Sequence, residues 1–236
     1  MADTGSQGSF ANIEQIADVM ARTNVRLVGT ANSVEVTQTG RNLVVDTYIE
    51  GQMNRAVSQA NTIKQTGDNA SATVSVSGDM NTFSVEQSST SFAGAGAGRN
   101  DASIAIDGSA NNAAIGQTND FGETYFNSAA LTQTGHGNNA AIYQTVSPAD
   151  LAAGGNMATI TQTGNDNDAL IEQTGADNSA SIEQDGSNNK GAILQDGEGL
   201  SAVLMQTGDA LEYTINQTGC VIATGCGTVV VSQGAH

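Results

Sequence analysis

The sequence predicts an all-β protein, a β-solenoid of stacked strand-loop-strand turns, and three observations lead to this fold class. Between Met157 and Thr218 a Gln falls on every eleventh residue. An aliphatic residue precedes each Gln by two places, and a Gly follows it by two places. Around each Gln the residues alternate with a period of two. A fixed short period of this kind marks small units that bury a core only by stacking on one another.

Each eleven-residue unit is expected to form one short strand and one corner. In the unit that contains Gln173, the period of two places Ala169 and Ile171 on the same face as Gln173. Gly175 tolerates positive φ and Asn178 is a turn former, so the chain reverses before the next strand. Two units then make one turn of about 22 residues, and the chain is expected to make roughly eight turns about 4.8 Å apart.

The Gln of the repeat is expected to face the interior. An identical Gln above and below would supply partners for its carbonyl and for both N–H groups, as an amide ladder. The alternative is that Gln is only a surface-compatible strand residue. The expected ladder and assembly residues are Gln133, Gln144, Gln162, Gln173, Gln184, Gln195, Gln206, Gln217, Gln233, Asn138, Asn167, Asn178 and Asn189. The expected core residues are Ile142, Ile160, Ile171, Ile182, Ile193, Leu204 and Ile215.

The repeat frame divides the chain into three parts. Residues 1–26 fit the frame poorly, and we expect an irregular N-terminal segment or a cap there. Residues 27–233 are expected to form the solenoid, and residues 234–236 a C-terminal tail. Within the solenoid the spacing lengthens at five places, four of which follow alternate strands. We therefore expect four of the five excursions to emerge on the same edge of the body.

Composition and charge exclude several classes of function. The chain holds 7 Lys and Arg against 24 Asp and Glu, a formal charge of −17, which argues against nucleic acid or an anionic membrane as a partner. No stretch is apolar over 18 residues, so we expect no membrane insertion. The acids are interpreted as a solvated face rather than a metal site. There is no nucleophile elbow, phosphate loop or metal-ligand spacing, so we expect neither an enzyme nor a cofactor.

The two cysteines bear on the cellular compartment. Cys220 and Cys226 lie six residues apart in a Gly-rich segment, and a loop disulfide is expected, whereas a zinc site would want more Cys or His nearby. A disulfide points to an oxidising, extracellular setting. No basic segment followed by an apolar one comes after Met1, so either a secretory signal has been removed or this route of export is not used.

A family resemblance follows from the residues of the repeat. The pattern Gln-x-Gly-x-x-Asn-x-Ala-x-Ile-x-Gln, as in residues 173–184, resembles the curlin repeat of curli fimbrial subunits over roughly residues 27–233. The resemblance implies a secreted bacterial subunit that folds as a strand-loop-strand solenoid and polymerises end to end into amyloid fibres of the biofilm matrix. It implies a homopolymer located at the cell surface, its signal peptide removed, with a nucleator and a secretion pore as further partners. The family commonly alternates Ser and Asn where this chain uses Asn in both halves.

Other functions stay open beside the fibre subunit. One is a minor or nucleating curli subunit, and another is a monomeric solenoid that binds a flat surface, as an adhesin or an ice-binding protein does. A row of Thr after the Gln would serve the latter, at Thr163, Thr174, Thr207 and Thr218, although Asp185 and Asp196 interrupt it.

The final strand is the expected docking edge for fibre growth. Residues 228–233 are β-branched, uncharged and free of Pro, which is typical of an open template rather than a cap. Val229 and Val231 are the residues expected to carry this edge.

Overall fold

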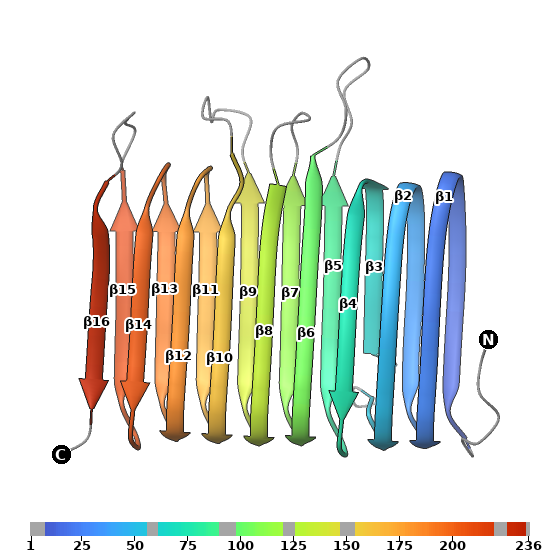
Figure 1. Ribbon diagram of the computed structural model, residues 1–236, viewed down its shortest axis with the longest axis horizontal. Coiled ribbons are helices and arrows are strands. Elements are labelled where there is room, and N and C mark those ends of the chain that lie inside the picture. Colours follow the sequence, from blue (N-terminus) through green and yellow to red (C-terminus); the bar gives the residue numbers. More distant parts are fainter. Residues whose placement is uncertain are drawn as a thin grey trace.

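The computed structural model describes residues 8–55, 61–89, 98–119, 126–146, 154–219 and 226–234, and it is a β-solenoid (Figure 1). Every described element is a strand, and all strand pairs are parallel. The predicted fold class is confirmed. The hydrogen-bonded path joins the strands into one sheet, which turns back on itself as two facing rows.

The odd-numbered and even-numbered strands form separate rows that run in opposite directions (Figure 1). The odd row contains β3 (Asn61–Asp68), β5 (Thr82–Ser89), β7 (Asn112–Asn119), β9 (Asn139–Val146), β11 (Asp168–Thr174), β13 (Lys190–Asp196) and β15 (Glu212–Thr218). The even row contains β4 (Ala70–Ser77), β6 (Arg99–Ser109), β8 (Phe126–His136), β10 (Met157–Asn165), β12 (Ser179–Ser187), β14 (Ser201–Thr207) and β16 (Thr228–Gly234).

Two long strands belong to both rows. β1 (Phe10–Thr30) and β2 (Ser33–Gln52) each bend through a corner and pair along their whole length. The first half of β2 pairs with β3 and its second half with β4. Adding the halves of β1 and β2 to the seven strands of each row gives nine turns among the described residues, one more than the eight expected.

The extra turn corrects the expectation for the N-terminal segment. Gln15 pairs with Gln38 and Leu27 with Ile49, so residues 10–30 complete a further turn of the solenoid instead of a cap. The spacing from Gln15 to Leu27 is twelve residues, one more than the repeat. The register shift between Ala17 and Val19 accommodates the additional residue as a bulge, which is why the frame is hard to recognise in the sequence. At the other end, Gly234 is the last residue of β16.

The register keeps equivalent residues of successive turns directly above one another. Met157 pairs with Ser179, an offset of 22 residues, where no extra residues intervene. It pairs with Ser128 on the other side, an offset of 29 residues, across a lengthened connection. The four strands that precede longer connections on one edge, β5, β7, β9 and β15, all belong to the odd row. The intervening residues of these connections lie outside the described ranges.

Glycine at the corners allows the turns to stack closely. Gly164 has a φ of +113°, and a Cβ added to it would meet the carbonyl oxygen of Gly186 in the next turn at 2.0 Å. Gly186 stands in the same relation to Gly208, at 2.0 Å. Any side chain at these corners would push adjacent turns apart, so the recurring Gly two places after the Gln is required by the approach of two backbones as well as by its φ.

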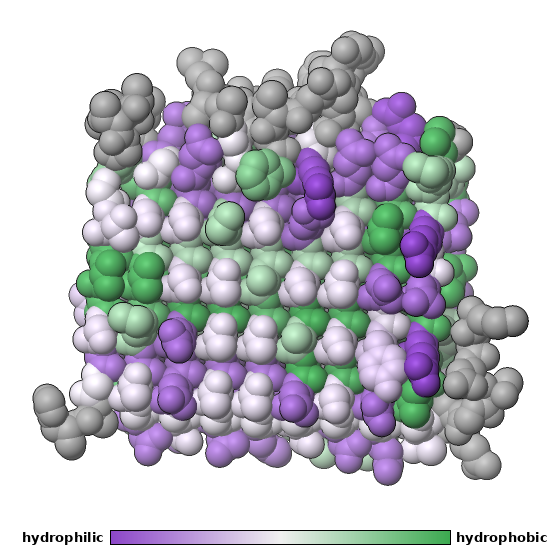
Figure 2. All heavy atoms as spheres, in the orientation of Figure 1, coloured by the Kyte–Doolittle hydropathy of each residue, from purple (hydrophilic) through white to green (hydrophobic). Residues whose placement is uncertain are grey.

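The outer face of β4, in the even row, carries short side chains. In β4 the outward positions are Ser71, Thr73, Ser75 and Ser77. Because like residues stack on like, the space-filling view shows bands of similar hydropathy running along the solenoid axis (Figure 2).

Candidate functional site

A continuous column of Gln side chains runs through the interior of the odd row. Nε2 of each Gln donates to Oε1 of the Gln in the next turn, at 2.6–2.9 Å. All donors point toward the C-terminal end, so the column has a direction. Its members are Gln15, Gln38, Gln65, Gln87, Gln117, Gln144, Gln173, Gln195 and Gln217.

From Gln65 onward, Nε2 of each Gln in this column also donates to a backbone carbonyl of the opposite row. Gln173 Nε2 donates to the Met157 carbonyl at 3.0 Å, and Gln195 Nε2 donates to the Ser179 carbonyl at 3.2 Å. An interior Gln thus has its oxygen and both N–H groups bound, while its side chain is at most 2% exposed. These hydrogen bonds allow a polar amide to occupy the core, since a buried polar group without a partner costs about 1–3 kcal/mol of stability.

The corresponding column of the even row changes character along its length. In the first four turns it is apolar, with Leu27, Ile49, Val76 and Ile106. From Gln133 onward it is a Gln ladder with donor–acceptor distances of 2.8–3.0 Å, formed by Gln133, Gln162, Gln184, Gln206 and Gln233. The two ladders together contain every Gln named as a ladder residue in the sequence analysis.

Asn side chains form two further columns at the corners. In most turns Oδ1 of the Asn accepts the backbone N–H of the residue above it in the next turn, as between Asn138 and Asn167 at 3.1 Å. Nδ2 reaches the carbonyl of the next corner Gly, as from Asn167 to Gly186 at 2.9 Å. One column holds Asn32, Asn54, Asn81, Asn111, Asn138, Asn167 and Asn189. The other holds Asn100, Asn127, Asn156 and Asn178.

The aliphatic residues two places before each Gln lie in the core between the rows. Six of the seven expected core residues are 0% exposed and Ile215, in the last odd strand, is 4% exposed. They stack on one another in register, Ile160 on Ile182 and Ile171 on Ile193. The core is thin because the other inward positions are mostly Ala.

The two end turns leave their interior columns exposed. At the C-terminal end Val229 pairs on Ala202 and Val231 on Leu204, so both valines continue inward columns. Val229 is 39% exposed. At the N-terminal end Ile13, which continues the inward column of Val36, is 44% exposed. Within the described residues β15 and β16 each pair on one side only, as β1 does, so their backbone groups form open sheet edges.

The repeats themselves have a recognisable family. The model of the curlin associated repeat matches three stretches, residues 62–88, 155–186 and 186–219. These three stretches are curlin repeats. The matched curlin repeats contain β3 to β5 and β10 to β15, where the Gln, Gly and Asn positions are best kept. No curated protein matched the chain.

Successive curlin repeats alternate between the rows, which corrects one expectation. The four Thr residues expected in a single row form two columns on opposite faces. Thr163 and Thr207 belong to the even row with Asp185 between them. Thr174 and Thr218 belong to the odd row with Asp196 between them. The eleven-residue period places every second unit on the other face, so a pattern read along the chain mixes the two surfaces.

Two groups of residues in the curlin-repeat body were absent from the expected site. The first is the N-terminal continuation of the odd ladder, including Gln15, whose Nε2 donates to Gln38 at 2.6 Å. The eleven-residue frame reaches Gln38, and only the bulge hides Gln15. The second is Tyr213, which occupies an inward slot in the last odd strand and is 41% exposed. Its alternation with Ile215 is the signal that could have identified it.

Cys226 lies next to the final turn of the solenoid. Cys226 is disulfide-bonded, and its Sγ lies 3.4 Å from the Glu198 carbonyl oxygen. Cys220 lies outside the described residues, so its pairing with Cys226 stays a prediction.

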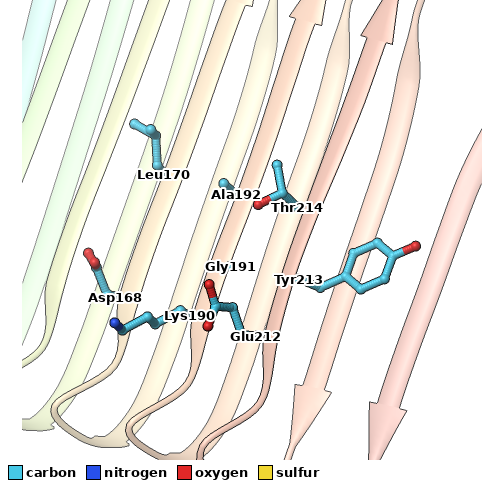
Figure 3. Close-up of a pocket in the computed structure, with 8 residues that line it drawn as sticks. All are labelled: Asp168, Leu170, Lys190, Gly191, Ala192, Glu212, Tyr213 and Thr214. Carbon is cyan, nitrogen blue, oxygen red and sulfur yellow. The ribbon is translucent and has the colours of Figure 1, made fainter.

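A shallow hollow of about 230 Å³ lies on the odd row near its C-terminal end (Figure 3). Lys190 stands in register between Asp168 and Glu212, and the short Gly191 and Ala192 leave the hollow open. The alternation of opposite charges between neighbouring strands gives Asp168, Lys190 and Glu212 a structural explanation, without a bound ligand. Within the described residues no cluster of three or more His, Cys, Asp or Glu could hold a metal ion. The same residues include no helix long and apolar enough to cross a membrane.

Proposed function

We propose that this protein is a self-assembling structural subunit of an extracellular curli-type amyloid fibre of the biofilm matrix, which polymerises end to end. The observation that carries the proposal is the open end of each interior column. Nine turns stack with equivalent residues paired, and β1, β15 and β16 each pair on one side only, so both ends leave strand edges that can accept another strand. The curlin-repeat family supports the same function.

A head-to-tail contact between opposite ends does not close on itself, so it generates a filament. Each added subunit extends the odd-row Gln column and the aliphatic columns in the same register. Each junction is stabilised by the same kinds of interaction as the contact between two interior turns, namely parallel backbone hydrogen bonds on both rows and buried side chains between the rows.

The experiment is fibre growth by a variant with lysines in the last even strand. Replacing Val229 and Val231 by Lys places two charges on the inward columns of the exposed end while the interior turns are untouched. We expect a folded monomer whose fibre growth, followed by electron microscopy and dye fluorescence, is strongly slowed. Val230→Lys is the matched control, because Val230 lies on the same strand, points outward and is 60% exposed.

A wild-type protein that stays monomeric at high concentration would refute the fibre function. It would favour the alternative of a monomeric surface-binding solenoid, for which the odd-row column Thr39, Thr66, Ser88, Thr118, Thr145 and Thr174 is the specific observation. Normal growth of the Val229→Lys, Val231→Lys variant would leave fibre formation intact and remove this strand as the docking edge.

A further inference from the structure

The odd-row ladder ends in complementary groups at the two ends of the body. At the C-terminal end Gln217 Nε2 donates to the Ser201 carbonyl at 3.0 Å, and the ladder places no further Gln beyond it within the described residues. In every earlier turn of this row the other hydrogen binds the next Gln. At the N-terminal end Gln15 donates to Gln38 but stands first in the ladder, so no Gln donates to its Oε1. A donor is therefore open at one end and an acceptor at the other.

The inward column that ends in Tyr213 shows a matching difference in size. In register below Tyr213 lie Gly191, Ala169, Ala140 and Ala113. A Cβ added to Gly191 would already lie 3.0 Å from Leu204 Cδ2 and 3.1 Å from Gln206 Oε1. A Cβ is already tight in the turn below, so the Gly191 position has no room for an aromatic ring, whereas Tyr213, which pairs with Gly191, carries one at the open end. Figure 3 shows the ring on the opposite side of β15 from the side chains of Glu212 and Thr214.

The first turn presents a small residue in the corresponding slot. Ala11 pairs with Val34 and stands four places before Gln15, as Tyr213 stands four places before Gln217. If Gln217 of one copy continues onto Gln15 of the next, Ile215 meets Ile13 and Tyr213 meets Ala11. The ring would then lie between Gly191 and Ala11, a large residue between two small ones, as in well-packed cores.

The even row is less well matched across the same contact. Val229 and Val231 would meet Thr23 and Val25, whereas Gln233 would meet Leu27. Gln233 Nε2 keeps a bond of 3.4 Å to the Glu212 carbonyl but gains no Gln partner. A Gln against an aliphatic residue already occurs inside the body, where Gln133 stacks on Ile106. The fold therefore tolerates this mismatch.

The charge distribution favours contact between unlike ends. Residues 1–99 hold six of the seven basic residues and nine of the 24 acidic ones, a formal charge of −3, whereas residues 100–236 carry −14. Contact between two C-terminal ends would bring the acidic halves together and set Tyr213 against Tyr213 and donor against donor. Contact between unlike ends separates the acidic halves by a nearly neutral one, which lowers repulsion within the screening length of about 8 Å at physiological salt.

We propose that subunits join in one orientation and one register, with Tyr213 of one copy seated on Ala11 of the next and Gln217 Nε2 donating to the neighbour's Gln15 Oε1. This junction rests on the proposed fibre function and specifies its contact. Tyr213 is the specificity-determining residue, because the slot over Gly191 accepts a large side chain only when the residue above it is small.

The test is a size swap across the junction. Ala11→Phe puts two rings in one slot, and Tyr213→Ala leaves a void there. Each change is expected to slow elongation by about tenfold, measured on seeds sheared from wild-type fibres or from fibres of the variant itself. The double variant Ala11→Phe, Tyr213→Ala moves the ring to the other side of the junction and should elongate its own seeds within about threefold of the wild-type rate. Asn12→Phe and Thr214→Ala are the matched controls, because these neighbours point outward, and neither should change elongation.

Each outcome separates the junction from the fibre function. Wild-type protein that forms no fibres removes the function itself. Two results would overturn the junction while leaving the function standing, provided that the wild type forms fibres. One is a double variant whose elongation is slowed by the combined effects of the two single changes. The other is an Asn12→Phe variant that elongates as slowly as Ala11→Phe. Circular dichroism of each fresh monomer establishes that it is folded. A second readout is register: fibres mixed from Asn12→Cys and Thr214→Cys subunits should cross-link between subunits on oxidation, whereas Arg26→Cys, on the other row, should not cross-link to Thr214→Cys.

Discussion

Gln133 lies directly above Ile106 in the even row, and its buried Oε1 has no hydrogen-bond partner. Every later Gln of this column receives a donor from the turn before it. Ile106 has none to give, so the place where the column changes from apolar to amide leaves one acceptor unpaired. A directional ladder that starts inside the body must have one such orphan at its first residue.

The direction of the ladder predicts unequal effects for the same substitution at two positions. Gln133→Met removes the orphan but leaves Gln162 Oε1 without its donor, so the number of unpaired Gln oxygens stays the same. Gln184→Met leaves both Gln206 Oε1 and one N–H of Gln162 unpaired. We expect the free energy of unfolding to fall by about 1–3 kcal/mol more in Gln184→Met, as measured by urea unfolding of fresh monomer. Equal losses would show that the amides act only as space-filling groups.

The Asn columns predict a separate loss at the corners. Asn167→Ala removes the acceptor of the Asn189 backbone N–H, 3.0 Å away, and the donor to the Gly186 carbonyl. The Asn189 N–H is then buried without this partner and the partly buried Gly186 carbonyl loses its donor, so we expect the free energy of unfolding to fall by about 2–4 kcal/mol. Asn139→Ala is the control, because Asn139 bonds Asn112 and Asp168 on the exposed surface. A control as damaging as Asn167→Ala would contradict a special role for the corner column.

The corner glycines predict that a single methyl group blocks stacking. Gly164→Ala would place Cβ 2.0 Å from the Gly186 carbonyl oxygen, whereas Gly199→Ala meets nothing within 4 Å. Both glycines have positive φ, at +113° and +67°, so each variant carries backbone strain and only the first adds a clash. We expect Gly164→Ala to prevent folding and Gly199→Ala to give folded protein, measured by circular dichroism and yield. Folded Gly164→Ala would mean that adjacent turns can separate without loss.

The sequence predicted the body of this fold well because its period is uninterrupted in the matched repeats. Every frame position from Leu27 to Gln233 pairs with its equivalent one turn away. The first turn was missed because the bulge at Ala17 and Val19 shifts the frame by one residue. The Thr residues were assigned to one surface because they were taken in chain order, although two units make each turn and place successive Thr residues on opposite rows.

The site was predictable in part for the same reason. Periodicity shows which side chains stack, so the Gln, Asn and Ile columns could be expected from spacing alone. It does not show how a column ends. The exposure of Tyr213 over Gly191, the orphan Oε1 of Gln133 and the open donor of Gln217 depend on which turn is last, and on which residue happens to precede each ladder.

The last prediction tests the assignment of the inner face by placing a charge on either side of one strand. Ile171 is 0% exposed between the rows, and Ile171→Asp would bury a carboxylate among Ala and Ile side chains with no cation beside it. Burial of an unpaired charge costs more than the marginal stability of a domain can offset, so we expect no folded monomer and no fibres. Ile182→Asp should do the same in the even row.

Leu170→Asp is the control, because Leu170 neighbours Ile171 on the outward side of the same strand and is only partly buried. It should fold and assemble with a modest loss of stability. Circular dichroism of the monomer and fibre yield by electron microscopy measure both arms, and unchanged fibre yield from Ile171→Asp would mean that the inner and outer faces of the solenoid are interchanged.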